Sequence, residues 1–231
     1  MIRRRKDYCK KSPSKDARKI YIICEGAETE KNYFSFFEGL SSNLELIVIP
    51  PESGTDPLKL MELAKCLFIN HSTQTRDLEY FQNDKVWFAI DTDTWETEGK
   101  IQPLRDFCEK QNNGIKENYD EIKPYDAWCV AQSNPCFEIW LYYHHFNSSP
   151  IMDEIENHAS FKAFVNQCIA GGFDFQRDPV RLKDAIENAE ANFKCDENNR
   201  LDIFSTEQFL LGKEIYAFVS SELQKLRNKF G

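Results

Sequence analysis

Two short, unbroken apolar runs constrain the fold of this chain more than any other feature. They extend from Ile20 to Cys24 and from Val86 to Ile90, and they consist almost entirely of β-branched and aromatic residues. Runs of this length and composition are typical of strands that are covered on both faces. A sheet covered on both faces requires helices on each side, so the runs predict an α/β protein.

The segments around these runs repeat the same order of strand and helix. Strands are predicted at residues 18–24, 44–49, 85–90 and 127–131, and helices at residues 28–40, from Asp56-Pro57 onward, at 101–111 and from Asn134-Pro135 onward. Asp56 is expected to cap its helix, with Pro57 at the first helical position, where the missing N–H costs nothing. This order predicts a mainly parallel sheet with right-handed crossovers.

The pattern changes after Asn147, where Ser148-Ser149-Pro150 interrupts the chain. The remaining helical periodicity falls at residues 161–170, 180–193 and 207–227, and no further apolar strand run follows. The sequence therefore predicts a basic N-terminal arm at 1–17, an α/β core at 18–147 and a helical C-terminal segment at 148–231.

Charge is distributed unevenly along the chain. Residues 1–19 hold nine Lys or Arg against two Asp, a net charge of +7, and the chain as a whole is −9, which leaves −16 for the rest. Arg3, Arg4 and Arg5 are candidates to bind substrate phosphates by releasing counterions, although such arms are often only solvated and mobile. Because the body is acidic, any nucleic-acid site is expected to be local and assisted by a metal.

Composition bears on the compartment and on the core. The chain is 41% hydrophobic, enough for one substantial core. Neither apolar run approaches the roughly 20 residues that cross a bilayer, and Arg3 to Lys6 follow the first two residues where a signal peptide would lead to an apolar stretch. The eight cysteines form no C-x-x-C pair. A cytoplasmic protein with reduced core thiols, and no contact with a membrane, is therefore expected.

Acidic residues follow both runs directly. Glu25 comes after the first run and is followed by Gly26, while Asp91 and Asp93 come after the second. Ligands gather at the carboxyl ends of parallel strands. Positions i and i+2 of an extended chain point the same way, so Asp91 and Asp93 are expected to face one ion. Oxygen ligands suit a hard cation, and the sequence predicts Mg²⁺ or Mn²⁺ here.

A phosphodiester is a natural substrate for such a site, because metal ions polarise the phosphoryl oxygens and activate a water. Glu25 is then a candidate general base or acid as well as a ligand. Glu30 and Glu138 stand at helix starts and are further candidates, although an acid at a helix N-terminus is also favourable by itself. His144 and His145 are interpreted as cations near a helix C-terminus and not as metal ligands.

Four blocks of the sequence together resemble the RloB family. They are Glu25-Gly26-Ala27-Glu28-Thr29-Glu30-Lys31-Asn32-Tyr33-Phe34, Gly54-Thr55-Asp56-Pro57-Leu58, Asp91-Thr92-Asp93 and Asn134-Pro135-Cys136-Phe137-Glu138-Ile139-Trp140. The resemblance covers about residues 18–146. It implies a Toprim-like, Rossmann-like α/β fold in which a strand-end glutamate and a later D-x-D bind Mg²⁺.

Carried over by position, the resemblance assigns the catalytic role to Glu25 and the metal roles to Asp91 and Asp93. Glu30, Glu138 and Asn134 lie inside matched blocks, which favours catalytic roles for the two acids and substrate binding for Asn134; the other interpretation of Asn134 is an ordinary N-cap. The C-terminal segment fits the family less well, and residues 204–207 stand where a Ser-Thr rich element is expected.

The resemblance also implies a biological role. RloB-like proteins are associated with abortive infection against phage, next to an RloA-type ATPase of the AAA/ABC class, an arrangement similar to AbiL. This implies an effector nuclease that a neighbouring ATPase controls. The sequence does not choose between DNA and RNA, and tRNA is as plausible a target as duplex DNA.

Two other interpretations remain open. Asp91-Thr92-Asp93-Thr94 after a strand is also the pattern of haloacid-dehalogenase-type phosphohydrolases, with Asp91 as nucleophile and Asp93 as general acid. That motif normally stands on the first strand of its core, whereas two strands precede it here. The second alternative is a non-catalytic adaptor that keeps the fold and acts by binding an ATPase.

Overall fold

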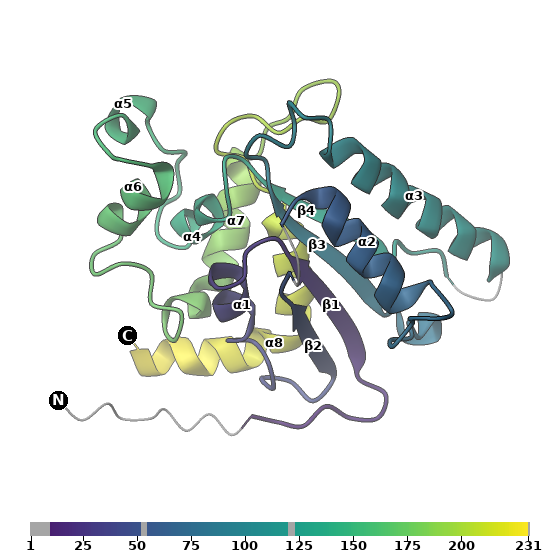
Figure 1. Ribbon diagram of the computed structural model, residues 1–231. Helices are drawn as coiled ribbons and strands as arrows, with labels where there is room; N and C mark the ends of the chain where they lie inside the picture. The colour runs from purple at the N-terminus through teal and green to yellow at the C-terminus, as the bar shows by residue number, and fades with distance from the viewer. Residues whose placement is uncertain (1–9, 52–54, 120–122, 231) are drawn as a thin grey trace.

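A four-stranded, all-parallel sheet forms the centre of the protein (Figure 1). The computed structural model describes residues 10–51, 55–119 and 123–230. The strand order is β2-β1-β3-β4, with β1 at Arg18–Cys24, β2 at Leu44–Ile49, β3 at Lys85–Asp91 and β4 at Trp128–Ser133. Both apolar runs form the two inner strands, and the predicted α/β class and parallel pairing are confirmed.

Helices cover both faces of the sheet, which explains why the apolar runs of the inner strands β1 and β3 have no polar interruption. Tyr21 and Ile23 of β1 face α2 and α3, whereas Ile20 and Ile22 face the opposite layer. The first layer contains α2 at Pro57–Phe68 and α3 at Ile101–Asn118, with η1 at Tyr80–Gln82 nearby in the chain. The second contains α1 at Thr29–Phe34, α4 at Glu138–Tyr143, α7 at Leu182–Asn192 and α8 at Gln208–Phe230.

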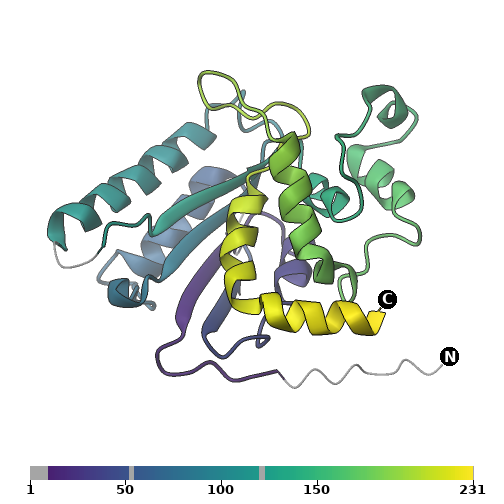
Figure 2. The same ribbon diagram turned by 180° about the vertical axis from the view of Figure 1, so that it is seen from behind.

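The C-terminal segment contributes to the same hydrophobic core as the sheet. Figure 2 shows α7 and α8 lying across one face of the sheet. Leu211, Ile215 and Val219 of α8 are fully buried in one cluster with Ile22 and Trp140. The smaller elements α5 at Met152–Ile155, α6 at Phe161–Cys168 and η2 at Asp178–Arg181 complete this side. The predicted helical content of this segment is thus observed, while the boundary at residue 147 stays a prediction.

Helix α1 is shorter than the predicted helix at 28–40. It ends at Phe34, and turns with i to i+3 hydrogen bonds lead to Gly39, whose φ is +72°. A left-handed residue cannot continue a helix, and the approach of Lys10 leaves little room for a side chain at Gly39. Helix α3 is longer than predicted, because Asn112 bonds the backbone N–H and C=O of Trp128 on β4 and holds the helix against the sheet.

The cap predicted at Asp56 is confirmed, since its Oδ1 accepts hydrogen bonds from the N–H groups of Leu58 (3.1 Å) and Lys59 (3.2 Å). Within the described ranges no helix is long and apolar enough to cross a membrane. The seven described cysteines are free, and three of them, Cys24, Cys108 and Cys136, are buried. Because three others are exposed, the expectation of core thiols holds for only part of the set.

Candidate active site

Glu25 lies at the carboxyl end of β1, against the neighbouring end of β3. Its Oε2 accepts a hydrogen bond from the N–H of Asp91 at 2.9 Å, and its Oε1 accepts one from Trp95 Nε1 at 2.7 Å. The residue is only 7% exposed. Burial raises the pKa of Glu25 to about 7, although the hydrogen bonds from Trp95 and Asp91 oppose that shift. Glu25 is therefore poised to exchange a proton near neutral pH.

Asp91 and Asp93 are placed differently from each other. Asp91 ends β3, and its Oδ1 accepts a hydrogen bond from the N–H of Phe137 at 2.8 Å. Burial raises the pKa of Asp91 well above its ordinary value, and the charges of Glu30, Glu25 and Glu138 raise it further.

Asp93 lies beyond the strand, in a turn, exposed to solvent and with a φ of +37°. The expectation that Asp91 and Asp93 share one face of an extended segment is therefore wrong, because the extended conformation ends at Asp91. The Asp93 charge still raises the pKa of Glu25, so it acts on the same site from the solvent side.

Glu30 approaches Glu25 from the first turn of α1. Its Oε1 accepts a hydrogen bond from the N–H of Gly26 at 3.2 Å, and the residue is 4% exposed. A side chain at Gly26 would overlap the Glu30 carboxylate, so the glycine allows this close approach. The pKa of Glu30 is raised, first by burial and then by the charge of Glu138. Glu30 is thus a buried member of the carboxylate group and not a solvated acid at a helix start.

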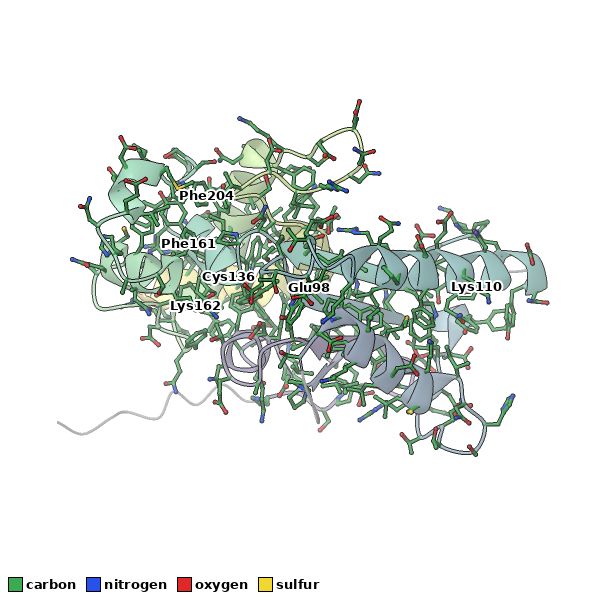
Figure 3. All side chains as sticks on the ribbon, turned by 45° about the horizontal axis from the view of Figure 1, so that its top comes forward. Glu98, Lys110, Cys136, Phe161, Lys162 and Phe204 are labelled. Atoms are coloured by element: carbon green, nitrogen blue, oxygen red, sulfur yellow. The ribbon has the colours of Figure 1, made fainter. Side chains whose placement is uncertain are left out.

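Glu138 completes the group from the start of α4. Its Oε1 lies 3.6 Å from Lys162 Nζ of α6, while its Oε2 is buried and accepts no hydrogen bond from the described residues. Although burial opposes it, the charges of Glu138 and Asp91 raise the pKa of Lys162. Figure 3, which brings the top of Figure 1 forward, shows Lys162 beside Cys136 at this edge. We call Glu25, Glu30, Asp91 and Glu138 the carboxylate cluster.

The chemistry of the carboxylate cluster suits a divalent cation. Among the residues that the structure describes, the charge of Lys162 acts on three of the four carboxyl groups, and the Glu138 Oε2 is a buried oxygen without a donor. Among the described residues, no three Asp, Glu, His or Cys side chains are already arranged to hold a metal ion. Mg²⁺ does not need such a cage, because it keeps several waters and commonly binds through one or two carboxylates together with substrate phosphates. The donors present therefore fit Mg²⁺ or Mn²⁺.

Asn134 holds the C-terminal segment against this edge. Its Nδ2 donates to the carbonyl of Leu201 at 2.7 Å, its N–H donates to Ser205, and its carbonyl accepts from the N–H of Phe204. The segment predicted as Ser-Thr rich thus docks directly after β4, where Ser133 and Thr206 form an antiparallel bridge. In this structure Asn134 positions a loop; the predicted substrate contact stays a prediction. Arg3, Arg4 and Arg5 lie outside the described residues.

A second contact fixes the same segment to β4. Glu207 Oε2 accepts from the N–H of Gln132 at 3.1 Å and from Arg105 Nη2 of α3 at 2.7 Å. Arg105 also donates to Gln132 Oε1, and Gln132 Nε2 donates to Thr92 Oγ1 in the turn after β3. This chain of hydrogen bonds connects the C-terminal segment to the turn that carries Asp91 and Asp93.

His144 is not the helix-end cation that its position suggests. It is 1% exposed, its Nδ1–H donates to the carbonyl of Trp140, and its Nε2 accepts from the Tyr33 hydroxyl, each at 3.0 Å. Burial lowers the pKa of His144 to about 3, so the ring is neutral. The pKa of His145 is lowered as well, again by burial, although Asp178 opposes the shift.

Sequence patterns did not identify two residues at the site. Trp95 hydrogen-bonds Glu25 and stands just after the D-x-D motif, so its indole could have been noted as a donor close to the acids. Lys162 comes from α6, in the segment with the weakest family pattern, and no local signal connects it to Glu138.

The chain was compared with known proteins in three ways. A family model described as RloB-like protein matches residues 20–215. No curated protein and no solved structure matches the chain.

Proposed function

The chain belongs to the RloB-like protein family, and we propose that it is a Toprim-type nuclease that uses Mg²⁺ or Mn²⁺ to cleave phosphodiester bonds. We propose further that it acts as an effector of anti-phage abortive infection under the control of a neighbouring AAA/ABC-type ATPase. Its substrate is DNA or RNA, with tRNA among the candidates.

One observation supports the catalytic proposal above the others. Carboxylates from the ends of β1 and β3 and from the starts of α1 and α4 gather at one edge of a parallel sheet, buried and with an excess of negative charge. Such a group destabilises the free protein, because like charges and burial both penalise ionised carboxyls. A bound cation would offset this destabilisation, so the arrangement is expected of a site that binds a cation during turnover.

The residues divide the chemistry among them. A bound divalent ion supplies Lewis-acid stabilisation of the phosphoryl oxygens and of the leaving oxygen. Asp91 and Glu138 offer oxygens to hold it, and Asp93 stands at the solvent side where a substrate would enter. Glu25, with a pKa of about 7, can accept the proton of the attacking water. Lys162 can pair with a substrate phosphate.

The deciding experiment is a titration of Mg²⁺ and Mn²⁺ with plasmid, single-stranded DNA and tRNA as substrates, each with and without the neighbouring ATPase. Asp91→Asn and Glu25→Gln keep the shape of the side chain and should each reduce cleavage at least about a hundredfold. Asp126→Asn is a matched control, because Asp126 is exposed at the opposite end of β4.

The competing functions give different results in the same experiment. If no condition yields metal-dependent cleavage that Asp91→Asn abolishes, the protein is a non-catalytic adaptor of an ATPase complex. Rapid turnover of an aryl phosphate that does not change in Glu25→Gln would identify a haloacid-dehalogenase-type phosphohydrolase.

A further inference from the structure

A cavity of about 430 Å³ lies on the side of the second helix layer, away from the carboxylate cluster. Residues that directly follow α6, residues of η2 and its N-cap, and the C-terminal part of α8 surround it. Three arginines line it: Arg177, Arg181 and Arg227. Its volume falls within the range of about 300–1,000 Å³ that is usual for small-molecule sites.

The three arginines are exposed, and other described side chains occupy only part of their hydrogen-bonding capacity. Arg177 donates through Nε and Nη2 to Asp178, and Arg227 donates through Nη1 and Nη2 to Asp184. A guanidinium has five N–H donors, so each of these ion pairs leaves three. Arg181 has no hydrogen-bond or ion-pair partner among the residues that the structure describes. Donors therefore reach the cavity from η2 on one side and from α8 on the other.

The charge of the cavity is opposite to that of the body. Asp178 is the one carboxylate on its lining, and Asp184 on α7 offsets part of the Arg227 charge from outside. Burial lowers the pKa of His145, which also lines the cavity, and Arg181 and Arg177 lower it further, although Asp178 opposes the shift. The lining thus keeps a net positive charge in a protein whose sequence after residue 19 carries −16.

Apolar side chains form the rest of the wall. Ile169 is 3% exposed and Val180 7%, and both line the cavity beside Ala170. Sites for small organic anions combine such a wall with a few placed charges. Guanidinium groups that converge from two elements suit the three terminal oxygens of a phosphate better than the two coplanar oxygens of a carboxylate.

We propose that this cavity binds the phosphate monoester of a nucleotide-sized molecule. Arg181 provides the principal contact to the phosphate, Arg177 and Arg227 contribute their remaining N–H groups, and Ile169 and Val180 contact the organic part. The proposal is independent of the nuclease proposal, since no residue of the carboxylate cluster lines the cavity.

Calorimetric titration of the full chain without metal tests it, with inorganic phosphate, AMP and adenosine as probes. Inorganic phosphate and AMP are expected to bind and adenosine is not. Arg181→Gln should weaken AMP binding about tenfold or more. Arg181→Lys should recover part of the loss, because lysine keeps the positive charge but lacks the paired N–H donors with which a guanidinium binds a phosphate. The Ile169 and Val180 methyl resonances should shift with AMP, which places the ligand in this cavity and not on the basic N-terminal arm.

Lys183→Gln is the matched control, because Lys183 pairs with Glu187 on the surface and does not line the cavity. It should leave AMP affinity within about twofold. The proposal is overturned if AMP does not bind, if Arg181→Gln and Lys183→Gln weaken it equally, or if only resonances outside the cavity respond. Each of these outcomes is independent of whether the protein cleaves nucleic acid.

Discussion

Burial and hydrogen bonding have opposite effects on the pKa of Glu25. Two donors stabilise its ionised form, yet burial dominates and raises its pKa to about 7. A raised carboxyl pKa means that the folded protein prefers the protonated form. The preference of the folded protein for protonated Glu25 contributes fully to the free energy of unfolding below pH 4.5, the ordinary pKa of a glutamate. This contribution falls as the pH rises from 4.5 and is lost above about pH 7.

This pKa predicts how Glu25→Gln changes stability with pH. The amide of Glu25→Gln cannot ionise. The free energy of unfolding of the variant, relative to the wild type without metal, should therefore rise as the pH increases from 4.5 to 7, and it should reach a plateau of about 3 kcal/mol by pH 8. Urea unfolding at pH 4, 6 and 8 measures the difference. A difference that does not vary with pH would show that Glu25 has an ordinary pKa.

A substitution at Gly26 is expected to change the position of the Glu30 carboxylate with little effect on the stability of the fold. Gly26→Ala places a methyl group where the Glu30 carboxylate now lies, and the flexible end of Glu30 can move aside. We expect cleavage to fall by at least about tenfold while the unfolding free energy changes by no more than about 1 kcal/mol. Activity assays and thermal unfolding on the same preparation test this, with Gly114→Ala as a control at a position of α3 where an added methyl group meets no atom within 4 Å. Unchanged cleavage in Gly26→Ala would show that the position of Glu30 does not matter for the reaction.

The segment at residues 204–208 is the element that connects the C-terminal helices to the sheet. Phe204 adopts a φ of +66°, and Ser205, Thr206 and Gln208 follow it, each no more than 1% exposed. Thr206 Oγ1 bonds Ser133 Oγ at 2.8 Å and accepts from the N–H of Gln208 at 3.1 Å. These contacts explain why polar residues are buried beside the end of β4.

Thr206→Val keeps the shape of the side chain and removes its hydroxyl. It should cost about 1–3 kcal/mol, because Ser133 Oγ and the N–H of Gln208 lose their partner in a buried place. Urea denaturation measures the loss. Thr75→Val is the matched control, because Thr75 is exposed and its hydroxyl has no hydrogen-bond partner among the described residues, and it should stay within about 0.5 kcal/mol. Equal effects of both substitutions would contradict a structural role for the segment.

The elements that the sequence predicted well are those with a local cause. Strands β1 and β3 follow from continuous apolar runs, and the start of α2 follows from the Asp56 cap. Parallel topology then brings Glu25 and Asp91 to one edge. The contact between Glu138 and Lys162 has no local cause, because it depends on how α6 packs against α4.

Two errors have the same origin. His144 was expected to be a cation at a helix end, and Asp93 was expected to continue an extended strand. Both expectations came from position within one element, whereas the outcome depends on burial against Tyr33 in the first case and on the turn after β3 in the second. Residue patterns describe single elements well and the environment between elements poorly.

Cation binding at the carboxylate cluster is expected to stabilise the whole folded molecule. Because Glu25 and Asp91 have raised pKa values, protons compete with a divalent ion for the carboxylate cluster. Mg²⁺ at about 100 times the dissociation constant that holds at pH 8 should stabilise the protein by about 2.7 kcal/mol at pH 8, and the same Mg²⁺ concentration should stabilise it by less at pH 6. Thermal unfolding with Mg²⁺ and with Ca²⁺, for the wild type and Asp91→Asn, measures this. If Mg²⁺ stabilises the wild type and Asp91→Asn equally, the ion binds at another site.

We propose that the carboxylate cluster binds a divalent cation. The most direct measurement is a crystal structure with Mn²⁺, with data collected at an energy where manganese scatters anomalously. We expect an anomalous peak in contact with the carboxylate of Asp91 and at least one other member of the cluster, and no such peak in Asp91→Asn. Well-ordered carboxylates in a Mn²⁺-containing crystal, with no anomalous density among them, would contradict it.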